Sequence, residues 1–166
     1  MSKKNGLFLL ITILIVFLDQ ATKAWIVANM SLHDSHAVVN GLFNITYIRN
    51  PGAAFGFLAG ASPLFRYVFF IAVTVGAILL IIYYLRIAKK EDLELVSALA
   101  LIFAGAVGNL IDRARFGEVV DFLDFYLGKY HWPAFNAADS AITIGAVIIA
   151  VVMFRRSLFR RSLFRR

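Results

Sequence analysis

The chain has 166 residues, of which 61% are hydrophobic and only 16% are charged, and its mean hydropathy is +0.79. A soluble domain carries roughly 25% charged residues, so this composition indicates a polytopic membrane protein. The absence of cysteine excludes disulfides, thiolate catalysis, iron–sulfur clusters and Cys-based zinc sites. The three histidines have no HExxH-like spacing, so the sequence predicts no metal site.

The net charge of +7 is concentrated at the C-terminus, where the last twelve residues include six arginines. A basic tail directly after an apolar segment is typical of an anchor that binds anionic lipid at the cytoplasmic membrane surface. No basic groove with interleaved aromatic residues occurs elsewhere in the sequence. We therefore expect no nucleic-acid partner.

Four apolar blocks predict four transmembrane helices, so the expected fold class is an all-α polytopic membrane protein. The third block is rich in alanine and glycine, which let helix backbones approach closely, so it should be the central and most buried helix. Pro133 is suited to the first turn of the fourth helix. A single membrane domain is expected at 1–154, with a basic cytoplasmic tail at 155–166. The expected spans are about 7–30, 64–87, 94–113 and 133–154.

The distribution of lysine and arginine predicts the orientation in the membrane. Basic residues gather at the N-terminus, in the loop between the second and third spans, and in the tail: Lys3, Lys4, Arg86, Lys89, Lys90 and the six arginines. Both termini are therefore expected in the cytoplasm. The loops at 31–63 and 114–132 would face outward.

The first outer loop is predicted to form a small extracytoplasmic β-sheet. Its GLFNITYI sequence, at 41–48, has the β-branched and aromatic content of strands, and NPG at 50–52 has turn chemistry. The GAAFGFLAGASP sequence that follows is expected to be an interfacial loop segment, with Phe55, Phe57 and Leu58 entering the lipid.

Ionisable residues at the membrane edge are candidates for function. Asp19 and Lys23 are four residues apart, so they lie on one helix face and can pair, which favours a structural role. The GNLIDR sequence places Asn109, Asp112 and Arg113 on one polar face at the outer end of the third span. Asp112 beside Arg113 can be charge-compensated, which suits an orienting role better than proton transfer.

The fourth span begins with FNAADS, in which Asn136 and Asp139 are three residues apart. From this segment alone, a hydrogen-bonded clamp between helices and an active site are about equally favoured. Asp121 and Asp124 lie just upstream, in a short apolar run that suits packing at the membrane surface.

A second carboxylate near Asp139 would create a pair with its own chemistry. Like charges at close range cannot both ionise cheaply, so two such carboxylates share one proton. One member can then act as general base for water and the other as general acid. Spacing alone leaves Asp112, Asp121 and Asp124 open as the partner.

Taken together, LDQATK, NPGAAFGF, GNLIDR, VVDF and PAFNAADSAITIG resemble the lipoprotein signal peptidase family, also called signal peptidase II. The resemblance covers nearly the whole chain, and five motifs in order are far more specific than any one of them. In that family the catalytic aspartates are those of the VVDF and FNxADS motifs, which implies Asp121 and Asp139 here. Asp124 is outside the motif and is left as a surface or supporting residue.

The resemblance also implies roles for the other polar residues. Asn50, Asn109, Arg113 and Asn136 would line the substrate site. Asp112 would support Arg113 and its neighbours, and the pair of Asp19 and Lys23 would contribute structure near the site.

The activity implied by the resemblance is that of an intramembrane aspartic endopeptidase in the bacterial cytoplasmic (inner) membrane, with its active site at the outer face. It would remove the signal peptide from prolipoproteins by cleaving before a cysteine that carries diacylglycerol. No cofactor is needed, because water activated by a carboxylate is the nucleophile. Expected partners are prolipoprotein substrates, membrane lipids and globomycin-type inhibitors.

Two other hypotheses use the same carboxylates. A small proton-coupled membrane transporter would use them as relay groups, but it expects interrupted helices and inverted halves, and no such symmetry relates the first two spans to the last two. A non-enzymatic membrane scaffold would use the Asn/Asp pairs as helix clamps. The scaffold predicts that replacing aspartate by asparagine is tolerated.

Overall fold

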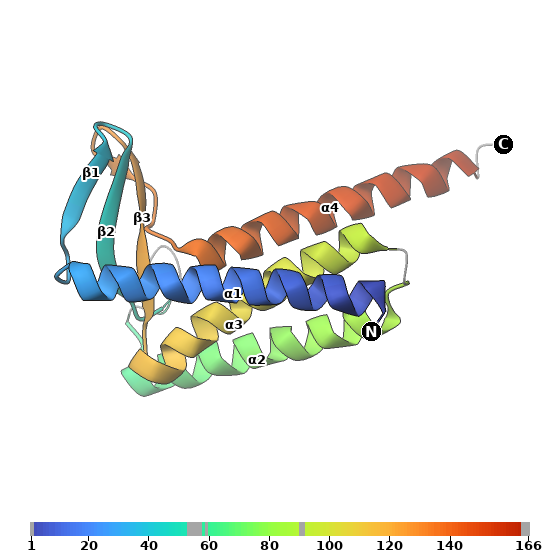
Figure 1. Ribbon diagram of the computed structural model, residues 1–166, viewed down its shortest axis with the longest axis horizontal. Helices are drawn as coiled ribbons and strands as arrows, with labels where there is room; N and C mark the ends of the chain where they lie inside the picture. The colour runs from blue at the N-terminus through green and yellow to red at the C-terminus, as the bar shows by residue number, and fades with distance from the viewer. Residues whose placement is uncertain (1, 53–57, 59, 90–91, 164–166) are drawn as a thin grey trace.

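The computed structural model describes residues 2–52, 58, 60–89 and 92–163. Four long helices form a bundle, and a small sheet stands at one end of it, away from the N-terminal end of α1 and the C-terminal end of α4 (Figure 1). Over the described residues, four helices are long and apolar enough to cross a membrane. The predicted fold class is therefore confirmed. The elements in order are α1 (Lys3–Asn29), β1 (Ser35–Val39), β2 (Phe43–Asn50), α2 (Pro63–Ile87), α3 (Leu93–Phe116), β3 (Val119–Leu127), β4 (Tyr130–His131) and α4 (Ala137–Leu163).

Local sequence determines where α2 and α3 begin and end. The Ser62 hydroxyl accepts a hydrogen bond from the N–H of Phe65, and Pro63 follows in the first turn of α2, where a missing N–H costs nothing. Helix α3 ends at Gly117, whose φ of 77° lies in the left-handed region that glycine adopts without strain. This turn redirects the chain from α3 directly into β3.

Helix α3 is the most buried of the four, as its small residues predicted. Its contact with α4 is so close that a methyl group at Gly105 would lie 2.3 Å from the carbonyl oxygen of Ala138. A methyl group at Gly145, on α4, would lie 2.7 Å from the carbonyl oxygen of Ala98. Glycine at these two positions therefore lets the backbones touch, and the start of α4 is held against α3.

The prediction that the fourth helix begins at Pro133 is wrong, because α4 begins at Ala137. The residues before it follow β3 instead. The N–H of Phe135 donates to the carbonyl of Leu123 at 3.1 Å, and the carbonyl of Phe135 accepts from the N–H groups of Phe122 and Leu123 at 3.0 and 2.9 Å. These backbone bonds to a strand replace the helical ones that the sequence pattern suggested.

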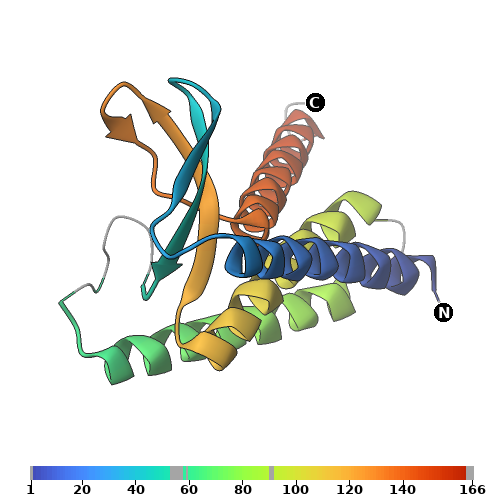
Figure 2. The same ribbon diagram turned by 60° about the vertical axis from the view of Figure 1, so that its left-hand side comes forward.

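The sheet is antiparallel, with the strand order β1-β2-β3-β4, and it stands across the end of the bundle (Figure 2). The strand predicted at 41–48 corresponds to most of β2. Strand β3 was not predicted, because its first four residues are all buried and show no alternation of polar and apolar side chains. The pairing of β2 with β3 places Asn50 opposite Val119 and Ile48 opposite Asp121. The turn after β2 therefore lies beside Asp121.

A small hydrophobic cluster attaches the sheet to α1. Tyr47, Val120 and Phe122 of the sheet pack with Ile26 and Met30, at the C-terminal end of α1. Each of the five side chains is at most 9% exposed. Burial of this apolar surface fixes the sheet, and with it Asp121, relative to the bundle.

Phe55 and Phe57 of the predicted interfacial segment lie outside the described residues. Leu58 is described, and it is partly exposed with a φ of 64°. The entry of this segment into lipid stays a prediction.

Candidate active site

Asp121 and Asp139 line the same cavity at the sheet end of the bundle. Asp121 is the third residue of β3 and Asp139 is the third residue of α4. The cavity has a volume of about 590 Å³, and Asn50, Asn109 and Arg113 also line it. Strand β3 and helix α4 thus bring together two carboxylates that are 18 positions apart in the sequence.

Asn136 connects the two carboxylates. It is fully buried behind the cavity wall, and its side-chain Nδ2 donates to Oδ1 of Asp121 at 2.7 Å. Its Oδ1 accepts from the N–H of Asp139 at 2.9 Å, and its own N–H donates to Oδ2 of Asp139 at 3.2 Å. The last two bonds form a reciprocal capping box that starts α4. One residue therefore positions both carboxylates.

Each carboxylate has a second carboxamide partner. Asn50 Nδ2 donates to Oδ2 of Asp121 at 2.9 Å, and Asn109 Nδ2 donates to Oδ1 of Asp139 at 2.8 Å. All four carboxylate oxygens accept from protein N–H groups, and each keeps a lone pair for water or substrate.

The surroundings of Asp121 favour its protonated form. Burial and, after it, the charge of Asp139 raise the pKa of Asp121 to about 7, although the hydrogen bonds from Asn50 and Asn136 lower it. A carboxyl group with a pKa near neutrality can both give and take a proton at physiological pH, as general acid–base catalysis requires.

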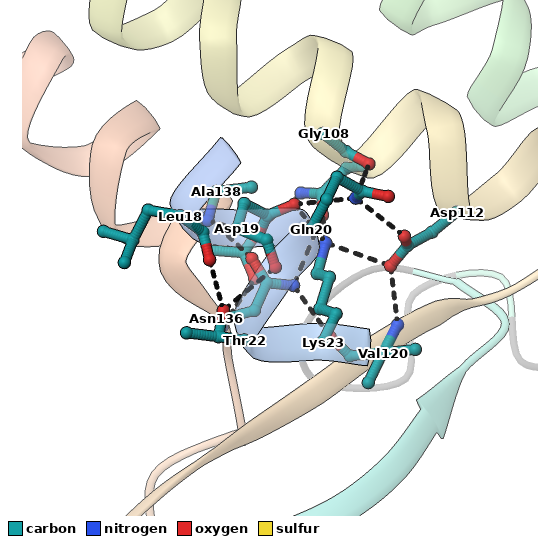
Figure 3. A network of polar contacts seen from close by, with 12 residues as sticks. Leu18, Asp19, Gln20, Thr22, Lys23, Gly108, Asp112, Val120, Asn136 and Ala138 are labelled. Atoms are coloured by element: carbon teal, nitrogen blue, oxygen red, sulfur yellow. Dashed lines mark hydrogen bonds and ion pairs between the residues drawn. The ribbon is translucent and has the colours of Figure 1, made fainter. Parts of the chain in front are cut away.

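Lys23 orients the side chain of Asn109 from behind the cavity. Its ammonium is 2.9 Å from Asp19 and 3.0 Å from Asp112 (Figure 3). It is also 3.0 Å from Oδ1 of Asn109, and the Lys23 side chain is only 3% exposed. An ammonium group can only donate, so it selects the rotamer in which the amide oxygen of Asn109 faces Lys23. The amide NH₂ of Asn109 is then directed to Asp139. The predicted pairing of Asp19 with Lys23 is confirmed.

Asp19 and Gln20 join α1 to α3 and α4 (Figure 3). Asp19 Oδ1 accepts from the N–H of Ala138 at 2.9 Å, in the first turn of α4, where backbone donors lack helical partners. Gln20 Nε2 lies 3.0 Å from Asp19, 3.1 Å from Asp112 and 3.2 Å from the carbonyl of Gly108. Gln20 was not predicted as a functional residue, although a carboxamide inside an apolar span is itself a signal of function.

Asp112 and Arg113 contact different partners at the edge of the cavity. Asp112 binds Lys23 and accepts from the N–H of Val120 at 3.1 Å, so it fixes the residue next to Asp121. Arg113 donates to the carbonyl of Gly52 at 3.3 Å, and its guanidinium lies 5.0 Å from the centre of the Phe70 ring. Arg113 thereby joins the turn after β2 to α2 and α3.

Asp124 lies farther along β3, outside the cavity. Its carboxylate accepts from Asn44 Nδ2 at 2.9 Å and lies 2.9 Å from Nδ1 of His131. Over the residues that the structure describes, no group of three His, Asp or Glu side chains converges in a way that could hold a metal ion.

Asp121, which is buried, and Asp139, which is half-buried, are both bound by carboxamides and line one cavity in a bundle of four membrane-length helices, an arrangement that suits acid–base chemistry between two carboxylates. The model of the family described as signal peptidase (SPase) II matches residues 11–155. The chain therefore belongs to the signal peptidase II family and is a peptidase.

Individual relatives agree with this family. The chain is 57% identical over 149 residues to the lipoprotein signal peptidase of Syntrophus aciditrophicus (strain SB), covering 90% of this chain and 92% of the relative. It is 56% identical over 139 residues to the lipoprotein signal peptidase of Desulforapulum autotrophicum, covering 84% and 86%. A solved structure of a bacterial membrane enzyme is similar with a TM-score of 0.82 and 38% identity, covering 92% of this chain and 90% of the other.

Proposed function

We propose that this peptidase removes the signal peptide from bacterial prolipoproteins, cleaving before the diacylglyceryl-modified cysteine, with Asp121 and Asp139 as its catalytic pair. The names of the relatives support the substrate class. The observation that carries the catalytic assignment is Asn136, which binds both carboxylates and holds them on one cavity.

The reaction requires one proton on the pair. The ionised carboxylate takes a proton from water as the water oxygen attacks the scissile carbonyl carbon, and the protonated partner donates its proton to the carbonyl oxygen. The resulting gem-diol collapses as the C–N bond breaks. One carboxyl group gives its proton to the leaving nitrogen, and the other carboxylate takes a proton from the diol. A pKa of about 7 for Asp121 suits both roles near neutral pH.

The cavity also offers a route for a lipid-anchored substrate. Its lining continues along α4 through Ile142, Thr143 and Ile144, and Ile144 is 53% exposed on the helix surface that would face lipid. A cysteine held by its diacylglyceryl chains in the bilayer could therefore present the bond from the side.

The location that we propose is the bacterial inner membrane, with both termini cytoplasmic and the cavity at the outer face. The basic N-terminus, the basic α2–α3 loop and the arginine tail favour the cytoplasm for the end of the bundle away from the sheet. That assignment directs the sheet and the cavity outward, where a translocated substrate would arrive.

The test is the cleavage of a diacylglyceryl-modified prolipoprotein by Asp121→Asn, Asp139→Asn and the matched control Asp124→Asn. We expect the first two variants to lose at least ~100-fold in rate, because each removes an acid–base group, while the control stays within about threefold. Purified variants should elute as folded protein. Normal turnover by either of the first two would refute the catalytic pair and assign that aspartate a structural role as a clamp between elements.

Globomycin-type cyclic peptides and membrane lipids are the further partners that we propose. A cyclic peptide that occupies the cavity should compete with substrate and raise the unfolding temperature of the wild-type enzyme. Inhibition that does not weaken as substrate is raised would exclude binding at the cavity.

A further inference from the structure

We propose that the protein binds the phosphate of an anionic phospholipid of the outer leaflet in a second groove, between α1 and α3. This α1–α3 groove has a volume of about 190 Å³, and it shares no lining residue with the cavity that holds Asp121 and Asp139. Its lining includes Gln20, Ala24, Val27, Arg115, Phe116 and Val120.

Two guanidinium groups converge on one aromatic ring at the rim of the groove. The guanidinium carbons of Arg49 and Arg115 lie 4.3 and 5.0 Å from the centre of the Phe116 ring. Within the described part of the chain, neither arginine forms an ion pair with a carboxylate, Glu118 on the following turn included. The two guanidinium carbons are therefore at most 9.3 Å apart, and cations at that separation repel each other when no carboxylate pairs with them. An anion bound between them would offset that repulsion.

Ordinary structural roles account for only part of this arrangement. Arg115 is in the last turn of α3, where the helix dipole favours a cation. Arg49 comes from β2 instead, and a hydrogen bond of 2.8 Å to the hydroxyl of Tyr47 directs it to the same ring. Because Tyr47 is buried, the position of the second cation is built into the fold.

The depth of the groove in the membrane favours a lipid phosphate. Helix α3 has 24 residues, which at ~1.5 Å per residue give a length of about 36 Å. The hydrocarbon core of a bilayer is about 30 Å thick. Arg115 and Phe116, at the end of α3, therefore lie at the level of the headgroups rather than in the hydrocarbon or in bulk water.

The groove continues into an apolar helix face on which an acyl chain can lie. Ile13, Phe17, Gln20, Ala24 and Val27 are spaced by three or four residues, so they follow one face of α1. Ile13 and Phe17, on the bilayer side of Gln20, are 56% and 72% exposed. Gln20 and Asp112 form the polar part of the groove lining, where Gln20 Nε2 donates to Oδ1 of Asp112 (Figure 3). Two cations at one end and an apolar path at the other match a phospholipid better than free phosphate.

Fluorescence of Trp25 can test this proposal without interference from the arginine tail. Trp25 and Trp132 are the two tryptophans of the chain, so Trp132→Phe leaves one reporter. Trp25 is adjacent to Ala24 and 57% exposed. It is separated from the N-terminal end of α1 by about 30 Å of helix. Brominated lipids that quench it therefore lie near the groove.

The experiment compares brominated phosphatidylglycerol with brominated phosphatidylcholine in phosphatidylcholine bilayers that contain the Trp132→Phe protein. We expect phosphatidylglycerol to quench Trp25 at a several-fold lower mole fraction. The half-quenching fraction is the mole fraction of brominated phosphatidylglycerol that quenches half of the Trp25 fluorescence. Arg49→Gln or Arg115→Gln should each raise this fraction about fivefold. The two substitutions together should raise it roughly thirtyfold, or until the two lipids quench alike. The matched control is Lys129→Gln, which removes a cation near the β3–β4 turn and should change the fraction less than twofold.

Three outcomes would overturn the proposal. They are equal quenching by the two lipids in the parent protein, an unchanged half-quenching fraction in the double variant, and displacement of the lipid by millimolar inorganic phosphate. The last would identify free phosphate as the ligand. If Arg49→Gln fails to fold because Tyr47 loses its partner, the exposed Arg115→Gln variant still tests the predicted fivefold change.

Discussion

Replacing Lys23 by methionine should strongly destabilise the protein, because it removes the cation from two buried carboxylates. Asp19 and Asp112 are 0% and 1% exposed, and their oxygens lie 2.9 and 3.0 Å from the Lys23 ammonium. Loss of one partner from a buried ion pair costs about 3–5 kcal/mol, since the remaining charge is left uncompensated. Methionine has nearly the same length as lysine, so the change removes the charge with little loss of packing.

A double-mutant cycle separates the charge effect from a general loss of packing. In the Lys23→Met background, Asp112→Asn should recover about 1–2 kcal/mol, because it removes one of the unpaired charges, whereas in the wild-type background the same change should destabilise. The free energy of unfolding is measured by denaturation in mixed micelles, with exposed Lys129→Met as the control that should change it by less than about 0.5 kcal/mol. A Lys23→Met cost below about 1 kcal/mol, or the absence of recovery, would refute the reasoning.

Three further predictions concern stability. The pKa of Asp121 is about 7 in the folded protein against an ordinary 3.8, so its contribution to stability is full below pH 3.8 and is lost as pH rises through 7. Between pH 5 and 7, the unfolding free energy of the wild type relative to Asp121→Asn should therefore fall by about 1.4 kcal/mol per pH unit. A difference that stays constant with pH would contradict this prediction. Gly108→Ala should lower the unfolding free energy by about 1–3 kcal/mol, because a methyl group there would lie 2.5 Å from a carboxylate oxygen of Asp19. Gly76→Ala is the control, because a methyl group at Gly76 meets open space. Equal unfolding free energies for the two variants would exclude the predicted clash. Lys4→Met should lower the unfolding free energy by about 2 kcal/mol, because the Lys4 ammonium donates to two carbonyls at the end of α2 at 2.6 and 2.9 Å. An unfolding free energy in mixed micelles within about 0.5 kcal/mol of the wild type would show that water replaces these hydrogen bonds.

The helices could be predicted from the sequence because their signal is local. An apolar block of the required length is enough to identify a span, and small residues such as Gly105 are enough to identify the helix that others touch. The start of α4 could not be found this way. Pro133 fits a helical first turn, but the following Phe135 forms backbone hydrogen bonds with β3, which lies outside any local window.

The catalytic candidates illustrate the same limit. The cost of a carboxylate at the membrane edge singled out Asp139, and shared-proton chemistry required a partner. The choice among Asp112, Asp121 and Asp124 depends on strand β3, which places Asp121 at the cavity, whereas Asp112 binds Lys23 and Asp124 lies beyond the cavity. Because the first four residues of β3 are buried on both faces, this part of its sequence has no alternation from which the geometry could be predicted.

The reciprocal bonds between Asn136 and Asp139 have a practical consequence for trapping an enzyme–substrate complex. Alanine at Asp139 would remove the proposed catalytic group and also the acceptor for the N–H of Asn136, so the first turn of α4 would fray beside the cavity. Asparagine keeps an oxygen acceptor for that N–H. An inactive enzyme intended for crystallisation with an uncleaved substrate should therefore carry the amide rather than the truncated side chain.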